Sequence, residues 1–300
     1  MREAAGPHSP GTGPAERNTA ETSRGEQSTA PVRRNRDADW NAWPVADYLA
    51  ENYRELHPID IGVIRHHSAV YRSHAPGSLA RTLELGAGPN LYPLMLAGAA
   101  ARRIDALEPS AAGVRYLRRQ LAQGPDDSWG PFYALCRSLD PALPESCAEA
   151  LRPVRVVRGT ADDLVPGSYD LASMNFVAES VTEDLGEFTA LCETFVHAVR
   201  PGGRLLAAFM EGMPSYRIGA GPVWPALPVD ESALRAVFAP RTTGLRIARL
   251  AKDRTLPEYG DSGILLLTAE RPPASPSQKS QKSQRSQRSQ RPLGSLGSQG

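Results

Sequence analysis

Two glycines and a carboxylate give the sequence its clearest chemical signal. Gly86 and Gly88, with Ala87 between them, follow an apolar run that ends at Leu85, and Glu108 ends the next apolar run. Glycines at a strand-to-helix turn let the backbone approach a ligand, and an acid at the end of the following strand accepts hydrogen bonds from a ribose diol. The spacing therefore predicts a nucleoside site at these residues. The alternatives are an ordinary glycine turn and a surface glutamate.

The residues just after the turn separate two kinds of nucleoside ligand. A dinucleotide site usually needs a third small residue where this chain has Leu91, and Pro89 lacks the backbone N–H that a pyrophosphate would use. S-adenosyl-L-methionine carries no phosphate, so neither departure weakens its binding. We therefore expect S-adenosyl-L-methionine as the cofactor, with a dehydrogenase as the weaker alternative.

A third segment completes the expected cofactor site. Residues 159–164 follow the third apolar run, at the place where such sheets usually hold adenine. Thr160 stands directly after Gly159, where many methyltransferases have an acid. Asp162 or Asp163 either takes that role or is simply solvated, and the sequence leaves both readings open.

Neither the histidines nor the cysteines form a metal-binding pattern. Residues 57–74 hold four histidines, but no companion cysteine or HExxH arrangement accompanies them. The three cysteines are unevenly spaced and include no CxxC pair, which argues against a disulfide framework and fits a reducing compartment. We expect no metal site.

The elements that position these residues alternate in type along the chain. The expected strands are residues 81–85, 102–108, 154–159, 169–177, 204–211, 245–251 and 263–270, and the expected helices include 90–98, 111–123, 144–152, 182–200 and 231–239. Apolar strands separated by helices indicate a mainly parallel sheet covered on both faces. The last two strands follow one another directly. The fold class is therefore α/β, a Rossmann-like seven-stranded sheet with one reversed edge strand, and residues 37–76 add an N-terminal helical lid.

The two ends of the chain differ from its centre. Residues 1–36 are rich in Gly, Pro, Ser and charge, and residues 272–300 contain the repeat SQKSQKSQRSQRSQR. Neither end has enough apolar surface to offset the entropy of ordering, so we expect both to be disordered. Residues 37–271 remain as one folded domain.

Charge is divided unevenly and limits the partners. The formal charge is +1, yet residues 37–270 carry a net −7, and six cations without an acid follow Glu270. An acidic domain is poorly suited to nucleic acid as its substrate, whereas the basic tail is either solvated or in contact with RNA, DNA or anionic lipid. With no apolar leader and no run long enough to span a membrane, we expect a cytoplasmic location and no membrane partner.

Several separated stretches together resemble one enzyme family. They are Asp47-Tyr48-Leu49 with Tyr53, the stretch LELGAGPNLYPL, and residues 127–131, 199–203, 215–219 and 227–229. In this order and spacing, the chain from about Trp40 to Ala269 resembles the nicotinamide, phenylethanolamine and indolethylamine (thioether) N-methyltransferases, a family of class I S-adenosylmethionine-dependent enzymes. The resemblance makes residues 37–271 a methyltransferase domain.

The resemblance also implies roles for single residues. Tyr48 and Tyr53 match paired tyrosines that close over the cofactor, Asn90 and Tyr92 match contacts to its methionine end, and Glu108 matches the ribose acid. On the substrate side, the matching residues are Glu179 and Glu211, which would position the amine or accept its proton, and Tyr216 in the pocket wall. Ala226 replaces a hydroxyl-bearing residue of the family, so nicotinamide itself is not expected.

Together, these patterns predict an S-adenosylmethionine-dependent enzyme that methylates a small-molecule amine by direct in-line transfer. One alternative moves the acceptor atom to the oxygen, sulfur or carbon of a specialised metabolite. Another is a regulatory protein that binds S-adenosylmethionine without catalysis. The sequence leaves the identity of the acceptor and the oligomeric state open.

Overall fold

The computed structural model describes residues 34–274. The ends predicted to be disordered, 1–36 and 272–300, lie almost entirely outside the described residues. Residues 34–36 and 272–274 are the exceptions. Asn35–Asp37 form a 3-10 turn, and the backbone N–H of Asn35 donates to Glu187 at 3.1 Å. The described fold therefore begins slightly before the predicted boundary at residue 37.

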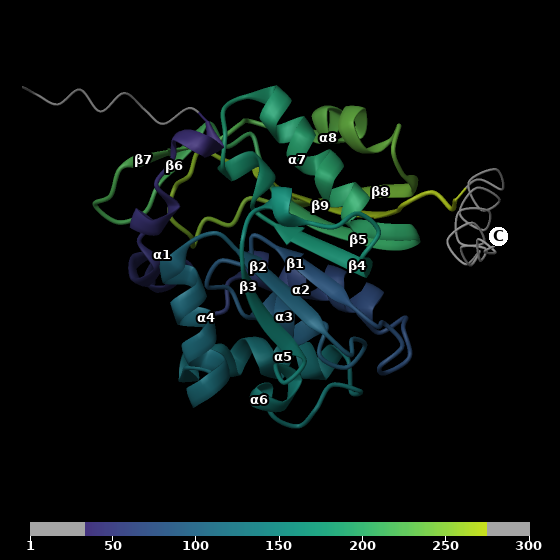
Figure 1. Ribbon diagram of the computed structural model, residues 1–300. Coiled ribbons are helices and arrows are strands. Elements are labelled where there is room, and N and C mark those ends of the chain that lie inside the picture. The colour runs from purple at the N-terminus through teal and green to yellow at the C-terminus, as the bar shows by residue number, and fades with distance from the viewer. Residues whose placement is uncertain (1–33, 275–300) are drawn as a thin grey trace, which may run out of the picture. The chain divides into compact units, whose positions relative to one another are not determined.

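A seven-stranded sheet organises the described residues, as predicted. Its order is β3-β2-β1-β4-β5-β9-β8, and Figure 1 shows the strands side by side. The strands are β1 (Thr82–Leu85), β2 (Ile104–Glu108), β3 (Val154–Arg158), β4 (Tyr169–Asn175), β5 (Val199–Glu211), β8 (Thr243–Ala251) and β9 (Gly263–Glu270). The pairs among β1 to β5 are parallel. The mostly parallel, Rossmann-like sheet predicted from the sequence is confirmed.

The position of the reversed strand differs from the prediction. Strand β9 runs antiparallel to both β5 and β8 and lies between them, so the reversed strand is one place in from the edge. The cause is the order of the final hairpin. The chain first lays β8 along the outer edge and then turns back through residues 252–262, so β9 fills the gap beside β5. Its central position fits its burial, since Ile264–Leu267 are all buried.

Alternating side chains divide the core into two layers. Along β5, Leu205, Ala207 and Phe209 join one buried cluster, whereas Leu206 and Ala208 join the other, as the two-residue period of a strand requires. One cluster includes residues of α7 (Leu185–Ala198) and α8 (Glu231–Phe238). The other includes residues of α2 (Pro58–Tyr71), α3 (Tyr92–Leu96), α4 (Ala111–Gln123), α5 (Gly130–Leu139) and α6 (Cys147–Ala150). Figure 1 shows α7 and α8 on the opposite side of the sheet from α3 and α5.

Side-chain caps fix the helices that border the carboxyl edge of the sheet. Ser110 accepts the N–H groups of residues 112 and 113 at the start of α4, and Asp184 accepts the N–H of Glu187 at the start of α7. Helix α3 is shorter than predicted. It begins at Tyr92 because the side chain of Asn90 accepts the N–H of Tyr92 in place of a helical carbonyl. The turn after β1 is thereby extended.

Two segments cover this edge of the sheet. The first is residues 34–44, called the strap, which contain η1 (Asn35–Asp37) and η2 (Trp40–Ala42) and lead into α1 (Val45–Asn52). The second is a hairpin of β6 (Ser215–Arg217) and β7 (Val223–Pro225) within the Gly/Pro-rich insertion. The remaining short elements are η3 (Asp127–Trp129), η4 (Ala161–Asp163) and η5 (Ala178–Ser180).

Candidate functional site: two adjoining cavities

Two cavities adjoin at the carboxyl ends of β1, β2 and β4. The first, called the glycine-turn cavity, has a volume of about 180 Å³ and includes Gly86, Ala87, Gly88, Glu108 and Thr160 in its lining. The second, called the aromatic cavity, has a volume of about 110 Å³. They share a wall made of Trp43, Tyr48, Phe176, Ser180 and Tyr216. Two ligands bound side by side would meet at this wall.

The glycine turn has the backbone conformation expected of it. Gly86 and Gly88 have φ values of +66° and +54°, in the region that favours glycine. A Cβ added to Gly86 would lie 2.7 Å from a methyl group of Val177, whereas one added to Gly88 would meet no protein atom within 4 Å. Gly86 therefore packs against the protein, and Gly88 faces open space.

Glu108 is held in place by the turn that it faces. Its carboxylate accepts the N–H of Gly88 at 2.9 Å and the N–H of Ser110 at 2.8 Å. The residue is 6% exposed. Burial raises the pKa of Glu108, and the two backbone N–H groups oppose that rise. A carboxylate fixed in this way keeps lone pairs for a ligand diol.

A second buried acid lines the same cavity and was missed at the sequence level. Glu84 in β1 accepts hydrogen bonds from Ser173 and, at 3.0 Å, from Asn175; Asn175 in turn contacts His67 at 2.9 Å. Burial raises the pKa of Glu84 to about 7. The available signal was a charged residue inside an otherwise apolar strand, opposite a strand that also carries polar residues.

Thr160 is in the lining of the glycine-turn cavity. Its backbone N–H donates to Asp163 at 2.8 Å. Asp163 thus caps its own turn, and neither it nor Asp162 is in the cavity lining. Neither Asp162 nor Asp163 therefore reaches the cavity.

The predicted tyrosines divide between the two cavities and the core. Tyr48 lines both cavities, and its hydroxyl lies 3.2 Å from that of Tyr53, which lines the aromatic cavity. Asn90 lines the glycine-turn cavity and donates to Tyr53 at 3.1 Å. Tyr92 is fully buried, stacks on Phe132 with ring centroids 6.0 Å apart, and belongs to neither lining. Tyr92 therefore supports the core at the base of the site.

Glu179, predicted to face an amine, lies behind the cavity wall. It is fully buried, and one carboxylate oxygen accepts the N–H of Met210 at 2.8 Å, while the other has no partner within the described residues. Burial raises its pKa to about 8. Met210 lines the aromatic cavity, and Glu179 does not. Glu179 is therefore outside the lining but bonded to a residue of it, and its role towards an amine stays a prediction.

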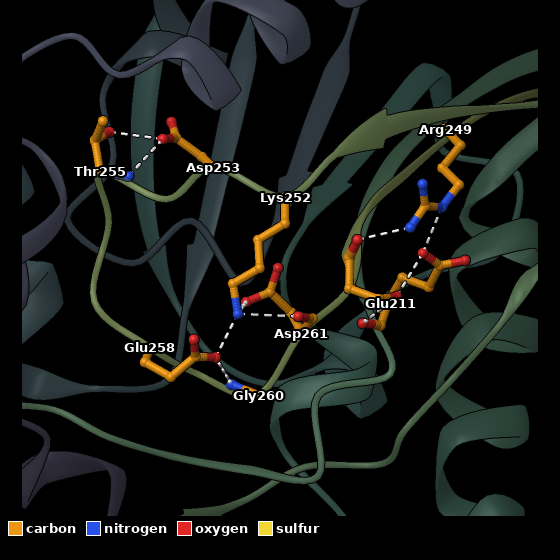
Figure 2. Close-up of polar contacts among 9 residues, drawn as sticks. Glu211, Arg249, Lys252, Asp253, Thr255, Glu258, Gly260 and Asp261 are labelled. Carbon is orange, nitrogen blue, oxygen red and sulfur yellow. Dashed lines mark hydrogen bonds and ion pairs between the residues drawn. The ribbon is translucent and has the colours of Figure 1, made fainter.

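Glu211, the second predicted substrate acid, is occupied by protein partners. Figure 2 shows its carboxylate beside Arg249. The distance to Arg249 Nε is 2.6 Å, and the hydroxyl of Ser262 donates to the same oxygen at 2.7 Å. Glu211 is in the lining of neither cavity. This acid ties the end of β5 to β8 and to the loop before β9.

Three other acids line the aromatic cavity instead: Asp60, Asp253 and Asp261. No lysine, arginine or histidine is in that lining, and most of the remaining surface is aromatic or aliphatic. Asp60 lies in the first turn of α2, whereas the other two lie in the loop between β8 and β9. An acid in the first turn of a helix is common as a cap, so the sequence around Asp60 gives no sign of a cavity.

Backbone strain lies on the shared wall. Phe176 has φ +59° and is the one residue other than glycine with a positive φ within residues 34–274. Its N–H donates to the carbonyl of Ala208, and its own carbonyl accepts a hydrogen bond from the hydroxyl of Ser180 at 2.5 Å. A bulky residue in this conformation is unfavourable and is often found at functional sites. Nothing in the sequence around Phe176 predicts it.

The strap closes one side of the glycine-turn cavity. Asn35, Trp40 and Trp43 line this cavity. Trp40 stacks on Trp224 of β7, with ring centroids 5.2 Å apart. The side chain of Asn41 accepts the N–H of Ala111 at the start of α4 at 2.9 Å. The strap is therefore held to β7 through Trp40 and to α4 through Asn41.

Residues 34–274 contain neither a metal-binding cluster nor a membrane-spanning helix. No three His, Cys, Asp or Glu side chains gather closely enough to hold a metal ion. No helix of this part of the chain is long and apolar enough to cross a membrane.

The comparisons with known proteins return structural similarities alone. No family model and no curated protein matches the sequence. One similar solved structure is the N-methyltransferase NodS of Bradyrhizobium japonicum WM9 in complex with S-adenosyl-L-homocysteine, with 14% identity, 76% of this chain and 96% of that chain covered, and a TM-score of 0.49.

Two further structures have comparable values. A possible exported protein from Bordetella parapertussis has 19% identity, covers 71% of this chain and 67% of that chain, and has a TM-score of 0.47. A protein described as an S-adenosylmethionine-dependent methyltransferase from Methanosarcina mazei has 13% identity, covers 68% and 98%, and has a TM-score of 0.46. Similarity this low does not identify a reaction.

Proposed function

We propose that the chain is an S-adenosylmethionine-dependent methyltransferase that transfers a methyl group to the nitrogen of a small-molecule amine. The observation that carries the proposal is the pair of adjoining cavities, one with the glycine turn and Glu108, the other aromatic and acidic. A two-substrate transfer needs both ligands held in contact, in line and away from water.

The donor set of the glycine-turn cavity fits this cofactor better than a dinucleotide. Its lining includes Glu84 and Glu108 and no lysine, arginine or histidine. Phosphate groups favour basic side chains, whereas the sulfonium and ammonium groups of S-adenosylmethionine favour carboxylates. When bound, the cofactor supplies an electrophilic methyl group. Glu108 would hold the ribose, Thr160 would lie near the adenine, and Glu84 and Asn90 would lie near the methionine end.

The chain's own contribution to the reaction is positioning. Tyr48, Phe176 and Tyr216 form the wall between the two ligands, and they would align the acceptor nitrogen with the methyl group. A carboxylate in the aromatic cavity would bind the amine or take its proton, so that the nitrogen lone pair is free to attack. The protonated amine would thus bind to a carboxylate of the aromatic cavity before it reacts.

The first test is cofactor binding by calorimetry. We expect the protein to bind S-adenosylmethionine with micromolar affinity and the Glu108→Gln variant to bind it about ten- to one-hundredfold more weakly, since hydrogen bonds to a charged group contribute about 1.5–3 kcal/mol. Glu270→Gln is the matched control, because Glu270 pairs with Arg204 at the opposite end of the sheet.

Turnover then decides between this function and its alternatives. S-adenosylhomocysteine formed with amines supports N-methylation. Turnover with phenols or thiols but not amines would move the acceptor atom to oxygen or sulfur. Binding of the cofactor without turnover across a broad panel of acceptors would favour the alternative of a regulatory protein. An unchanged affinity in Glu108→Gln would remove this acid from the site.

A further inference from the structure

The aromatic cavity contains one carboxylate whose bonding is incomplete. Asp253 is well satisfied, since it accepts the N–H of Ile59 at 3.1 Å and both the N–H and the hydroxyl of Thr255 at 2.9 and 2.6 Å. Asp261 lies 3.6 Å from the ammonium of Lys252. Figure 2 shows both of these acids turned towards their partners.

Asp60 differs from these two acids. It is 3% exposed, and within the described residues the one group that donates to its carboxylate is the N–H of His57, at 3.3 Å. A buried carboxylate with a single long hydrogen bond is costly unless another group completes its bonding. No cation of the protein is in the cavity lining. The cavity therefore presents an acid that has a single long hydrogen bond and no cation beside it, next to an apolar space.

The remaining walls suit an organic cation. Aromatic rings stabilise an ammonium group placed over their faces, and six line this cavity: Trp43, Tyr48, Tyr53, Phe176, Tyr216 and Tyr259. Aliphatic side chains fill most of the rest. An anionic acceptor would meet three carboxylates and no compensating charge. A long peptide or a nucleic acid would not fit a space of about 110 Å³.

On the basis of the proposed function, we infer that Asp60 is the residue that selects the methyl acceptor, by binding the ammonium of a compact amine with an apolar body. This assignment replaces Glu179 and Glu211, the two acids that the sequence suggested for the same role. Glu179 is not in the cavity lining and already accepts the N–H of Met210, and Glu211 is paired with Arg249.

The ionisation of Asp60 supplies a second, independent readout. Burial raises its pKa to about 8, the His57 N–H opposes the rise, and the charge of Asp253 adds to it. The other titratable groups near it are His57 itself and those of the lining, namely Tyr48, Tyr53, Tyr216, Tyr259 and Asp261, with Tyr92 behind them. A cation binds the ionised carboxylate. Amine affinity should therefore rise as the pH increases through about 8, while the amine stays protonated.

The experiment compares an amine with its neutral isostere. Benzylamine and benzyl alcohol, with cyclohexylamine and cyclohexanol as a second pair, are titrated into the full-length protein with S-adenosylhomocysteine present. We expect each amine to bind about tenfold or more tightly than its alcohol, and Asp60→Asn to abolish that preference and its pH dependence. Asparagine keeps an acceptor for the His57 N–H, and thermal unfolding confirms that the variant folds.

Glu211→Gln is the matched control, because its carboxylate is bonded outside the cavity; it should retain the preference for the amine. No preference for either amine in the unaltered protein would overturn the inference. The inference would also be overturned if Glu211→Gln or Asp261→Asn lost the preference for the amine while Asp60→Asn kept it. Binding of S-adenosylmethionine is measured in parallel, so a failure of Asp60 as the selecting residue is distinguished from a failure of the methyltransferase function.

Discussion

At the scale of single residues, the two glycines of the turn have different reasons to be glycine. Both have positive φ, a conformation that costs other residues about 1–2 kcal/mol. At Gly86 an added methyl group would also overlap Val177, whereas at Gly88 it would project into space that no protein atom fills. The first glycine therefore serves packing, and the second leaves room for a ligand.

This difference predicts opposite phenotypes for two alanine substitutions. Gly86→Ala should lower the free energy of unfolding by more than the conformational cost alone, because the new Cβ lies 2.7 Å from Val177. Gly88→Ala should cost only about 1–2 kcal/mol of stability. Of the two variants, Gly88→Ala should nevertheless show the larger loss of S-adenosylmethionine affinity in relation to its loss of stability. Denaturant unfolding and calorimetry on both variants provide the check. Equal stability losses, or full cofactor affinity in Gly88→Ala, would contradict this interpretation.

At the scale of elements, the strap joins parts of the fold that are distant in sequence. It contacts α7 through Asn35, α4 through Asn41 and β7 through the stacked pair Trp40 and Trp224. Each contact is small, but together they hold residues 34–44 over the glycine-turn cavity. A ligand bound there would lie against this segment.

The strap therefore predicts slower cofactor release than an open cavity would allow. Trp40→Ala removes a stacked pair worth about 0.5–1.5 kcal/mol, so S-adenosylmethionine affinity should fall between about twofold and tenfold, chiefly through faster dissociation. Trp40→Phe keeps a ring against Trp224 and should lose less. Stopped-flow displacement measures the dissociation rate directly. An unaltered rate in Trp40→Ala would mean that the strap does not control ligand exit.

Elements were predicted from the sequence better than the orientation of individual side chains. Strands β1, β2, β4, β5 and β9 follow from apolar runs, because burial on both faces of a sheet leaves a strong pattern. The place of β9 does not, since a hairpin can join the sheet by either of its strands. Glu179 shows the same limit. It follows Phe176, whose positive φ no local pattern signals, and the turn there puts the acid behind Met210.

At the scale of the whole molecule, buried acids govern how stability depends on pH. Burial raises the pKa of Asp60 and Glu179 to about 8 and that of Glu84 to about 7. In the unfolded chain these groups have lost their protons by about pH 5. Between about pH 5 and pH 8 the folded state therefore binds more protons than the unfolded state, and this contribution to stability decreases as the pH rises. Buried His67, with its pKa lowered to about 3, acts in the opposite sense below about pH 6.5.

Because three acids outweigh the single histidine, these effects predict a stability that falls steadily from about pH 5 to about pH 8, as the acids ionise within the fold. His67 opposes part of this fall below about pH 6.5, because the unfolded state binds a proton there that buried His67 does not. Denaturant midpoints measured from pH 5 to pH 9 test the shape of the curve. Combining Asp60→Asn, Glu84→Gln and Glu179→Gln should remove most of the fall, because amides cannot ionise, and should leave the rise with pH that His67 contributes below about pH 6.5. A decline that persists in the triple variant would assign the alkaline loss to other groups.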